Sequence, residues 1–221
     1  MSQWCRASLS KLDLQALANI SWSFANLLVC DPLLGCVDLW LSSSPVLESH
    51  AWEIKEVARY SNHLCQLLWA FSFTKCLSSR LSAHLQHKLL ETGRKLDQRL
   101  PHGTHPTFME EPLALPCPVV VERLRGILVI YKPPNWEVDA KSSATSSARP
   151  GGPGQLSQFL RSEGSQVLGL RDFENGFIHR LDVPSSGLIL AATTFEGLAF
   201  LQWQMHRYSI SPKLRMAYKY I

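Results

Sequence analysis

Apolar residues recur every three or four positions along the first hundred residues, which is the spacing that gathers side chains on one face of a helix. Residues 9–30 show this pattern with the apolar positions Leu14, Leu17, Ile20, Phe24 and Leu27. Similar patterns run over residues 52–73 and 79–100, the last of them polar enough to lie at a surface. The sequence therefore predicts an all-α region over residues 1–100.

Two segments of this helical region resemble each other at a distance of 47 residues. Residues 17–25 (Leu-Ala-Asn-Ile-Ser-Trp-Ser-Phe-Ala) and 64–72 (Leu-Cys-Gln-Leu-Leu-Trp-Ala-Phe-Ser) share Leu, Trp and Phe at the same places. A period in this range is typical of stacked helical repeats. The pattern resembles the helical repeats of organellar RNA-binding proteins, which implies a repeat-type RNA-binding region. A plain helical bundle with Trp and Phe in its core would give the same spacing.

The pattern changes to short strand-like runs after a proline-rich segment. Residues 101–118 contain five prolines, which indicates a linker. In the domain that we expect over residues 119–221, strand-like runs occupy 119–121 and 126–131, and short helical patterns occupy 156–160 and 195–205. Residues 141–154 hold mainly Ser, Ala, Pro and Gly and are expected to form a flexible insert. The predicted fold class is α+β, with the helical region first.

Composition favours a folded chain, because 46% of its 221 residues are hydrophobic and only 18% are charged. The net charge of +4 is unevenly distributed. Residues 1–120 carry ten Lys/Arg and ten Asp/Glu, whereas residues 121–221 carry twelve against eight. A positive balance on the second half suits a polyanionic partner such as nucleic acid. Ordinary solvated charge would give the same count.

The cysteines and the absence of targeting patterns bear on the compartment. All six cysteines fall in the first 117 residues without a Cys-x-x-Cys spacing, so no zinc site is expected: Cys5, Cys30, Cys36, Cys65, Cys76 and Cys117. No secretory signal or membrane-spanning run is evident. We therefore expect reduced thiols in an intracellular protein of the cytoplasm or of an organelle, a mitochondrion or a plastid.

Residues 176–190, Gly-Phe-Ile-His-Arg-Leu-Asp-Val-Pro-Ser-Ser-Gly-Leu-Ile-Leu, form the most informative stretch. An apolar run enters a compact polar group and leaves through another apolar run, which predicts a strand, a tight connection and a second strand. His179 and Arg180 stand shortly before Asp182, so cationic donors lie close to a carboxylate. Such a cluster can keep an aspartate ionised and ready to act as nucleophile or base. A solvated turn aspartate before Val-Pro would occupy the same position.

This stretch resembles the signature of the RluA-type pseudouridine synthases, in which His-Arg-Leu-Asp is followed by two variable residues and then Thr or Ser, Ser and Gly. Residues 179–187 match every fixed position. Lys132-Pro133, at the end of a strand-like run, resembles the first motif of the family. Asn135 replaces the usual Gly there, a substitution that is tolerable because asparagine can also adopt positive φ. Asp139 stands where the family often has His. The resemblance implies a mixed, mostly antiparallel sheet domain of pseudouridine synthase type.

The resemblance also implies roles for four residues. Asp182 would be the catalytic carboxylate, acting without metal or other cofactor. Arg180 would contact phosphate or fill the space left by a base that has been turned out of its stack. His179 would either orient the loop through hydrogen bonds or contact the substrate, and Lys132 would be a substrate-binding group.

The resemblance covers residues 125–210 and then fades. Family members continue with a Lys-x-Tyr strand and a segment rich in Thr, Gly, Arg and His. Residues 208–221 approximate only the first, in which Tyr218 or Tyr220 could stand for the family tyrosine, so we expect an incomplete sheet domain. The expected function is uridine isomerisation in ribosomal or transfer RNA by a monomer without membrane contact. The alternatives are a noncatalytic RNA-binding protein with a degenerate synthase domain and a helical protein-interaction module.

Overall fold

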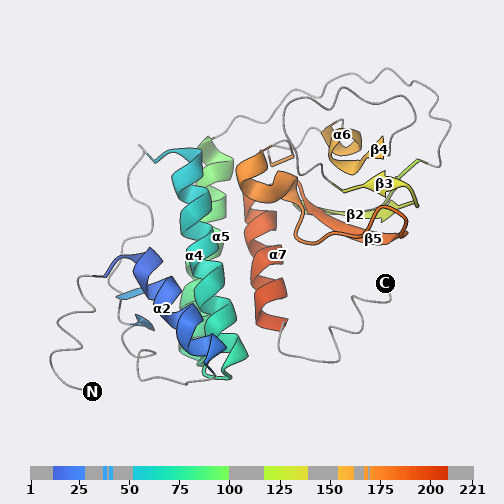
Figure 1. The fold of residues 1–221 in the computed structure, drawn as a ribbon. Coiled ribbons are helices and arrows are strands. Elements are labelled where there is room, and N and C mark those ends of the chain that lie inside the picture. The colour runs from blue at the N-terminus through green and yellow to red at the C-terminus, as the bar shows by residue number, and fades with distance from the viewer. Residues whose placement is uncertain are drawn as a thin grey trace, which may run out of the picture. The chain divides into compact units, whose positions relative to one another are not determined.

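A computed structural model of the chain describes residues 12–27, 37–38, 40–41, 52–99, 117–138, 154–161, 167–168 and 170–208 (Figure 1). These residues belong to two compact units, one drawn from residues 1–95 and 199–220 and the other from 96–198. The division falls within the helices α5 (Ser79–Arg99) and α7 (Phe195–Tyr208), and not at the proline-rich segment 101–118. Residues 101–116 of that segment and residues 141–153 of the expected insert lie outside the described residues.

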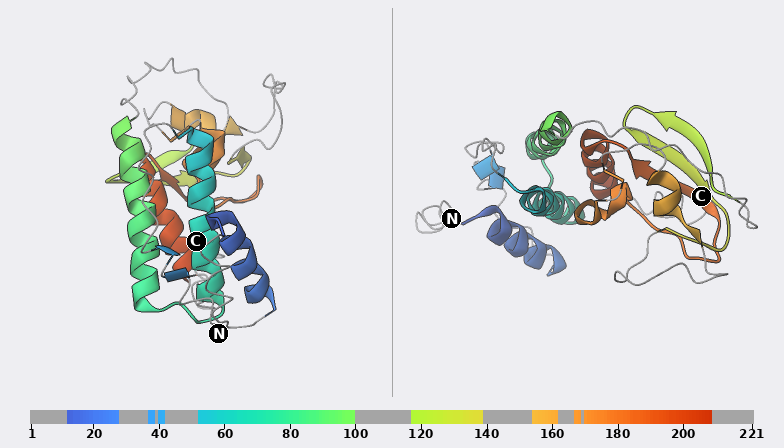
Figure 2. Two further views of the ribbon diagram at one scale, coloured as in Figure 1. Left: turned by 90° about the vertical axis from the view of Figure 1, so that its left-hand side faces the viewer. Right: turned by 90° about the horizontal axis from the view of Figure 1, so that it is seen from above.

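The helical unit contains α2 (Leu14–Asn26), α4 (Ile54–Phe73), most of α5 and the later part of α7. Within this unit α4 lies between α2 and α5 (Figure 2). Their apolar faces share one core that includes Leu17, Leu64, Leu85 and Trp203. The three helices expected from the sequence are confirmed, and the second runs unbroken through Ser61 and Asn62.

The buried face of α2 differs from the expected one. Its buried positions are Leu14, Leu17, Ala18, Ser21 and Ala25. Leu27, expected on the apolar face, is 71% exposed because the helix ends at Asn26 and Leu27 is its C-cap. At the other end, the Asp13 carboxylate accepts a hydrogen bond of 2.8 Å from the Ala16 N–H and so caps the helix.

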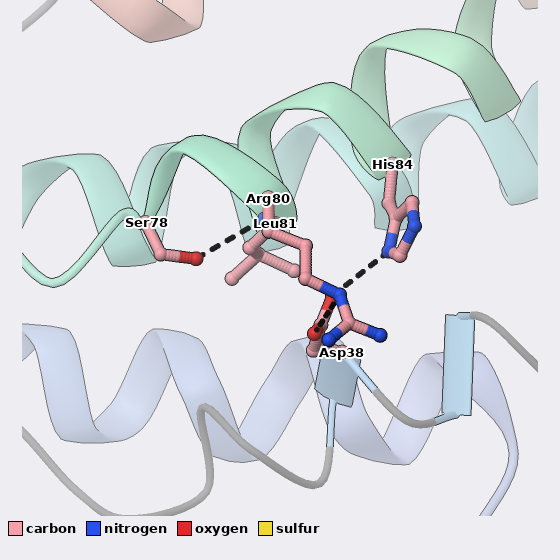
Figure 3. A network of polar contacts seen from close by, with 5 residues as sticks. All are labelled: Asp38, Ser78, Arg80, Leu81 and His84. Carbon is pink, nitrogen blue, oxygen red and sulfur yellow. Dashed lines mark hydrogen bonds and ion pairs between the residues drawn. The ribbon is translucent and has the colours of Figure 1, made fainter.

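The start of α5 is fixed by polar contacts (Figure 3). The Ser78 hydroxyl accepts a hydrogen bond of 3.1 Å from the Leu81 N–H, which caps the helix. Asp38 pairs with Arg80 Nε at 3.0 Å and with His84 Nδ1 at 2.8 Å. Arg80 and His84 lie on the same face because they are four residues apart. One carboxylate thus holds two successive turns of α5.

The expectation of reduced thiols holds for two of the described cysteines and fails for a third. Cys65 is a buried free thiol whose pKa is raised by burial to about 12, and Cys117 is an exposed free thiol. Cys76 is disulfide-bonded, so the expectation of reduced thiols is wrong at this residue.

Among the described helices, none combines the length and the apolar character that crossing a membrane requires.

The sheet unit is built on three antiparallel strands in the order β1-β2-β5. These are β1 (Val119–Leu124), β2 (Ile127–Lys132) and β5 (Gly187–Ala192). A second, two-stranded parallel sheet pairs β3 (Trp136–Glu137) with β4 (Gly154–Gln155). The helix α6 (Leu156–Arg161) and the 3-10 turn η1 (Arg171–Gly176) complete the unit together with the start of α7. An α+β fold with a small antiparallel sheet is therefore confirmed.

One face of this sheet packs on an apolar core. Leu128 and Ile130 of β2 stand opposite Ala191 and Ile189 of β5, and all four are buried. Val138, Leu156, Leu160, Leu168 and Phe177 complete the cluster. The strand expected before Asp182 is reduced to a single antiparallel bridge between Phe177 and Ala191. The residues that follow this bridge, 178–186, belong to no strand.

Candidate functional site

The two motifs found in the sequence meet at one end of the three-stranded sheet. Lys132, the last residue of β2, stands opposite Gly187, the first residue of β5. Beyond this pair, the Asn135 N–H donates a hydrogen bond of 2.8 Å to the Val183 carbonyl. Asn135 has φ of +66°, a conformation that asparagine tolerates better than most residues. The loop after β2 is therefore bonded directly to the loop that carries Asp182.

Residues 182–186, which we name the Asp182 turn, form a tight connection into β5. The Ser185 N–H donates a hydrogen bond of 3.0 Å to the Asp182 carbonyl and closes the turn. Gly187 follows with φ of +151°, in a region that other residues enter only with strain. The Asp182 side chain is exposed. Its carboxylate is thus presented to solvent from a turn whose backbone is fixed at both ends.

Lys132 is enclosed beneath this turn, with none of its surface exposed. Its ammonium donates hydrogen bonds to three backbone carbonyls, those of Pro133 at 3.3 Å, Val183 at 3.3 Å and Ser185 at 2.5 Å. Three donors and three carbonyl acceptors match the full hydrogen-bonding capacity of an ammonium group. The expected contact between Lys132 and a substrate stays a prediction. In this structure the residue positions the Asp182 turn.

The electrostatics of the site couple Lys132 to Asp182. Burial lowers the pKa of Lys132, because it disfavours the charged ammonium, and the Asp182 carboxylate opposes this effect. The two opposite charges therefore stabilise each other across the turn.

His179 connects the segment before Asp182 to β5. Its Nε2 accepts a hydrogen bond of 3.0 Å from the Leu190 N–H, so this ring nitrogen carries no proton. Burial lowers the pKa of His179, which agrees with a neutral ring. Of the two roles expected for His179, orientation of the loop is the one that this geometry supports. A substrate contact stays a prediction.

Side chains alternate between core and solvent over residues 179–182. His179 and Leu181 are half-buried, and Leu181 packs against the core of the sheet unit. Arg180 and Asp182 are exposed. Both charged side chains are therefore accessible to a ligand.

The structure therefore brings Lys132 together with the Asp182 turn at the end of β2 and the start of β5. His179 contacts Leu190 further along β5, and Arg180 is exposed. Asp139, Tyr218 and Tyr220 lie outside the described residues. Sequence patterns did not indicate the backbone carbonyls of Val183 and Ser185 as ligands of Lys132, since any residue type supplies a carbonyl. Comparisons of the chain with protein-family models, with curated proteins and with solved structures gave no match.

Proposed function

We propose that the chain is an RNA pseudouridine synthase in which Asp182 is the catalytic carboxylate. The observation that carries this proposal is the exposed Asp182 side chain on a turn tied to the sheet by the buried ammonium of Lys132. The resemblance of residues 179–187 to the synthase signature supplies the reaction. The positive balance of residues 121–221 suits an RNA substrate.

The reaction is an isomerisation in which every heavy atom of the base is retained. The bond from ribose to the base nitrogen breaks, the base turns, and a bond forms from ribose to a ring carbon, which releases its proton as the nitrogen gains one. Asp182 would begin this by attacking the anomeric carbon or by removing a proton from the neighbouring carbon. No redox step or donor of a group is needed for an exchange of this kind. An exposed, ionised carboxylate is the one group that either route requires.

The target base must first leave its stack, which takes a few kcal/mol in a duplex and less in a loop. Arg180 is exposed, as Asp182 is, and would contact the phosphate beside the target nucleotide or occupy the vacated space. A guanidinium suits either role, because it binds phosphate in a bidentate manner and stacks on bases. His179 would hold this segment against β5 during the reaction.

The test is chemical mapping of pseudouridine in total RNA incubated with the purified chain and with the Asp182→Asn variant. Asp172→Asn is the matched control, because Asp172 is another exposed aspartate of the sheet unit. We expect the same new pseudouridines with the wild type and with Asp172→Asn, and none with Asp182→Asn. Equal product from Asp182→Asn would contradict the assignment. Absence of product from all three, with RNA still bound, would favour the noncatalytic RNA-binding protein.

A further inference from the structure

Asn135 lies on the loop after β2, and its backbone is bonded to the residue that follows Asp182. The Asn135 N–H donates a hydrogen bond of 2.8 Å to the Val183 carbonyl. The Lys132 ammonium donates to the same carbonyl at 3.3 Å, so both acceptor sites of this oxygen are used. The Val183 carbonyl therefore ties Asn135 to the Asp182 turn. By standard backbone dimensions, the Cα atoms of Asn135 and Asp182 then lie within about 10 Å of each other.

The side chain of Asn135 is available to a ligand. It is exposed, and within the described part of the chain no hydrogen bond engages its carboxamide. The φ of +66° explains why the residue is Asn or Gly, but Gly meets this requirement without any side chain. Asparagine in a loop often bonds its side chain to the nearby backbone, and Asn135 does not. The backbone conformation thus leaves the carboxamide itself without a structural role.

A carboxamide matches the edge of uracil that base pairing normally uses. On this edge the N3–H donor stands between the acceptors O2 and O4. An asparagine side chain offers an acceptor oxygen and an N–H donor side by side, so it can bond N3–H and one of the two flanking oxygens together. Enzymes that act on a base taken out of its stack read the base through this edge. The contact therefore suits an unpaired uracil.

The same contact survives the turn of the base that the isomerisation requires. Ribose is bonded to N1 of the base in uridine and to C5 in pseudouridine. Half a turn about the line through N3 and C6 exchanges N1 with C5 and O2 with O4, and it leaves N3–H in place. An amide that bonds N3–H and O4 before the turn therefore meets N3–H and O2 after it. One fixed side chain thus suits the base in both orientations.

We propose that the Asn135 carboxamide binds this edge of the uracil on which Asp182 acts, and that it holds the detached base while the base turns. The amide oxygen accepts from N3–H, and the amide N–H donates to a ring oxygen. That oxygen carries part of the negative charge left on the base when the bond to ribose breaks with its electron pair, so the hydrogen bond strengthens in this step. The inference rests on the proposed isomerisation and adds a specificity-determining residue to it. The resemblance does not supply this residue, because Gly is usual at this position.

The first test compares rates of pseudouridine formation at a uridine mapped with the wild type. Asn135→Gly is the informative variant, because Gly adopts the same φ and keeps the N–H that bonds to Val183. We expect its kcat/KM to fall roughly five- to hundredfold, the usual effect of one bidentate contact to a base edge. Gln158→Ala, which removes an exposed amide of α6 in the same unit, should leave kcat/KM unchanged. Hydrogen exchange of the Ser185 amide should be the same in Asn135→Gly as in the wild type, because the turn keeps its own bonds.

The second test needs no turnover and uses the full chain with Asp182→Asn as background. Fluorescence anisotropy compares two labelled single-stranded oligoadenylates, one with a central uridine and one with a central 3-methyluridine, in which a methyl group replaces the N3 hydrogen. The parent should prefer uridine roughly five- to hundredfold, and Asn135→Gly in the same background should bind both alike. An unchanged preference in Asn135→Gly would overturn the proposal. Equal binding of both by the parent, or no binding of either at low salt, would overturn it as well.

Together the two tests distinguish the base contact from the reaction. Product from the wild type at a rate that Asn135→Gly equals would overturn the contact and leave the isomerase assignment standing. No product from the wild type, with a uridine preference that Asn135→Gly loses, would support the contact and overturn the isomerisation.

Discussion

The ammonium of Lys132 lies 3.3 Å from the carbonyl oxygen of Val183, the residue after Asp182, although 51 positions separate the two along the chain. A second bond to the Ser185 carbonyl holds the other side of the same turn. Lys132 is itself fixed by strand pairing with Gly187. The lysine of one motif thus sets the place of the aspartate of the other, through backbone atoms and through charge.

Replacement of Lys132 by Met is expected to loosen the Asp182 turn. The variant keeps roughly the length of the side chain and removes the three hydrogen bonds. The Pro133 and Ser185 carbonyls then lose this donor, whereas the Val183 carbonyl keeps the Asn135 N–H, and we expect the free energy of unfolding to fall by roughly 1–3 kcal/mol. Hydrogen exchange of the Ser185 and Asn135 amides should report the change directly, because both donate to this loop. Arg125→Met, at an exposed position between β1 and β2, should alter neither amide. Unchanged protection of Ser185 in Lys132→Met would contradict the positioning role.

The bond from Leu190 N–H to His179 predicts a dependence of stability on pH. The pKa of His179 is lowered in the folded chain, so the unfolded chain binds a proton more readily and stability falls as the pH drops below about 6.5. His63 and His206, whose pKa values burial also lowers, add to this loss. His179→Gln removes one of the three contributions. Urea denaturation at pH 7.5 and 5.5 should therefore show a smaller loss for the variant, and an equal loss would mean that His179 titrates alike in both states.

Much of the helical unit could be predicted, because apolar residues recur at helical spacing over the whole of residues 52–73 and 79–100. The expected face of α2 was partly wrong. Ile20, Phe24 and Leu27 also recur at helical spacing, but Leu27 lies at the helix end, and the small residues Ala18, Ser21 and Ala25 are buried together with Leu14 and Leu17. Periodicity counts large apolar residues, whereas close helix packing also uses small ones.

In the sheet unit, strands β1, β2 and β5 and the tight turn at Asp182 could be predicted from β-type residues and turn formers. The pairing of Trp136 with Gly154 could not, because it joins two residues across a segment of low complexity. The burial of Lys132 could not be predicted either. A lysine at a strand end is usually solvated, and its enclosure here depends on carbonyl oxygens that carry no sequence signal.

Gly197 lies so close to Gly126 that replacing Gly197 by alanine should lower the stability of the protein. A Cβ atom on Gly197 would lie 2.1 Å from the Gly126 carbonyl oxygen, and Gly126 has φ of +75°. Glycine to alanine inside a helix ordinarily stabilises by up to about 1 kcal/mol. Gly197→Ala should instead destabilise by roughly 1–3 kcal/mol, because the backbone of the β1–β2 turn must shift. Gln204→Ala on the same helix is the control, and a Gly197→Ala variant more stable than the wild type would contradict this contact.

The start of α7 is capped by a carboxylate from another helix. Asp97 of α5 accepts hydrogen bonds from the Phe195 N–H at 2.8 Å and the Glu196 N–H at 2.9 Å, and the Thr194 hydroxyl accepts one from the Gly197 N–H at 3.0 Å. Three N–H groups that a helix start leaves without partners are thereby satisfied, and the negative charge suits the helix dipole.

Asp97→Ala is therefore expected to lower the free energy of unfolding by about 0.5–2 kcal/mol, the range for a lost helix cap. Asp97→Asn keeps one acceptor oxygen without the charge and should fall between the wild type and the alanine variant. Gln98→Ala, at an exposed neighbouring position on α5, should leave stability unchanged. The amides of Phe195 and Glu196 should exchange faster in Asp97→Ala alone. The Gly197 amide donates to Thr194 and not to Asp97. Faster exchange at Phe195 and Glu196 without a change at Gly197 would therefore separate the contribution of Asp97 from that of Thr194.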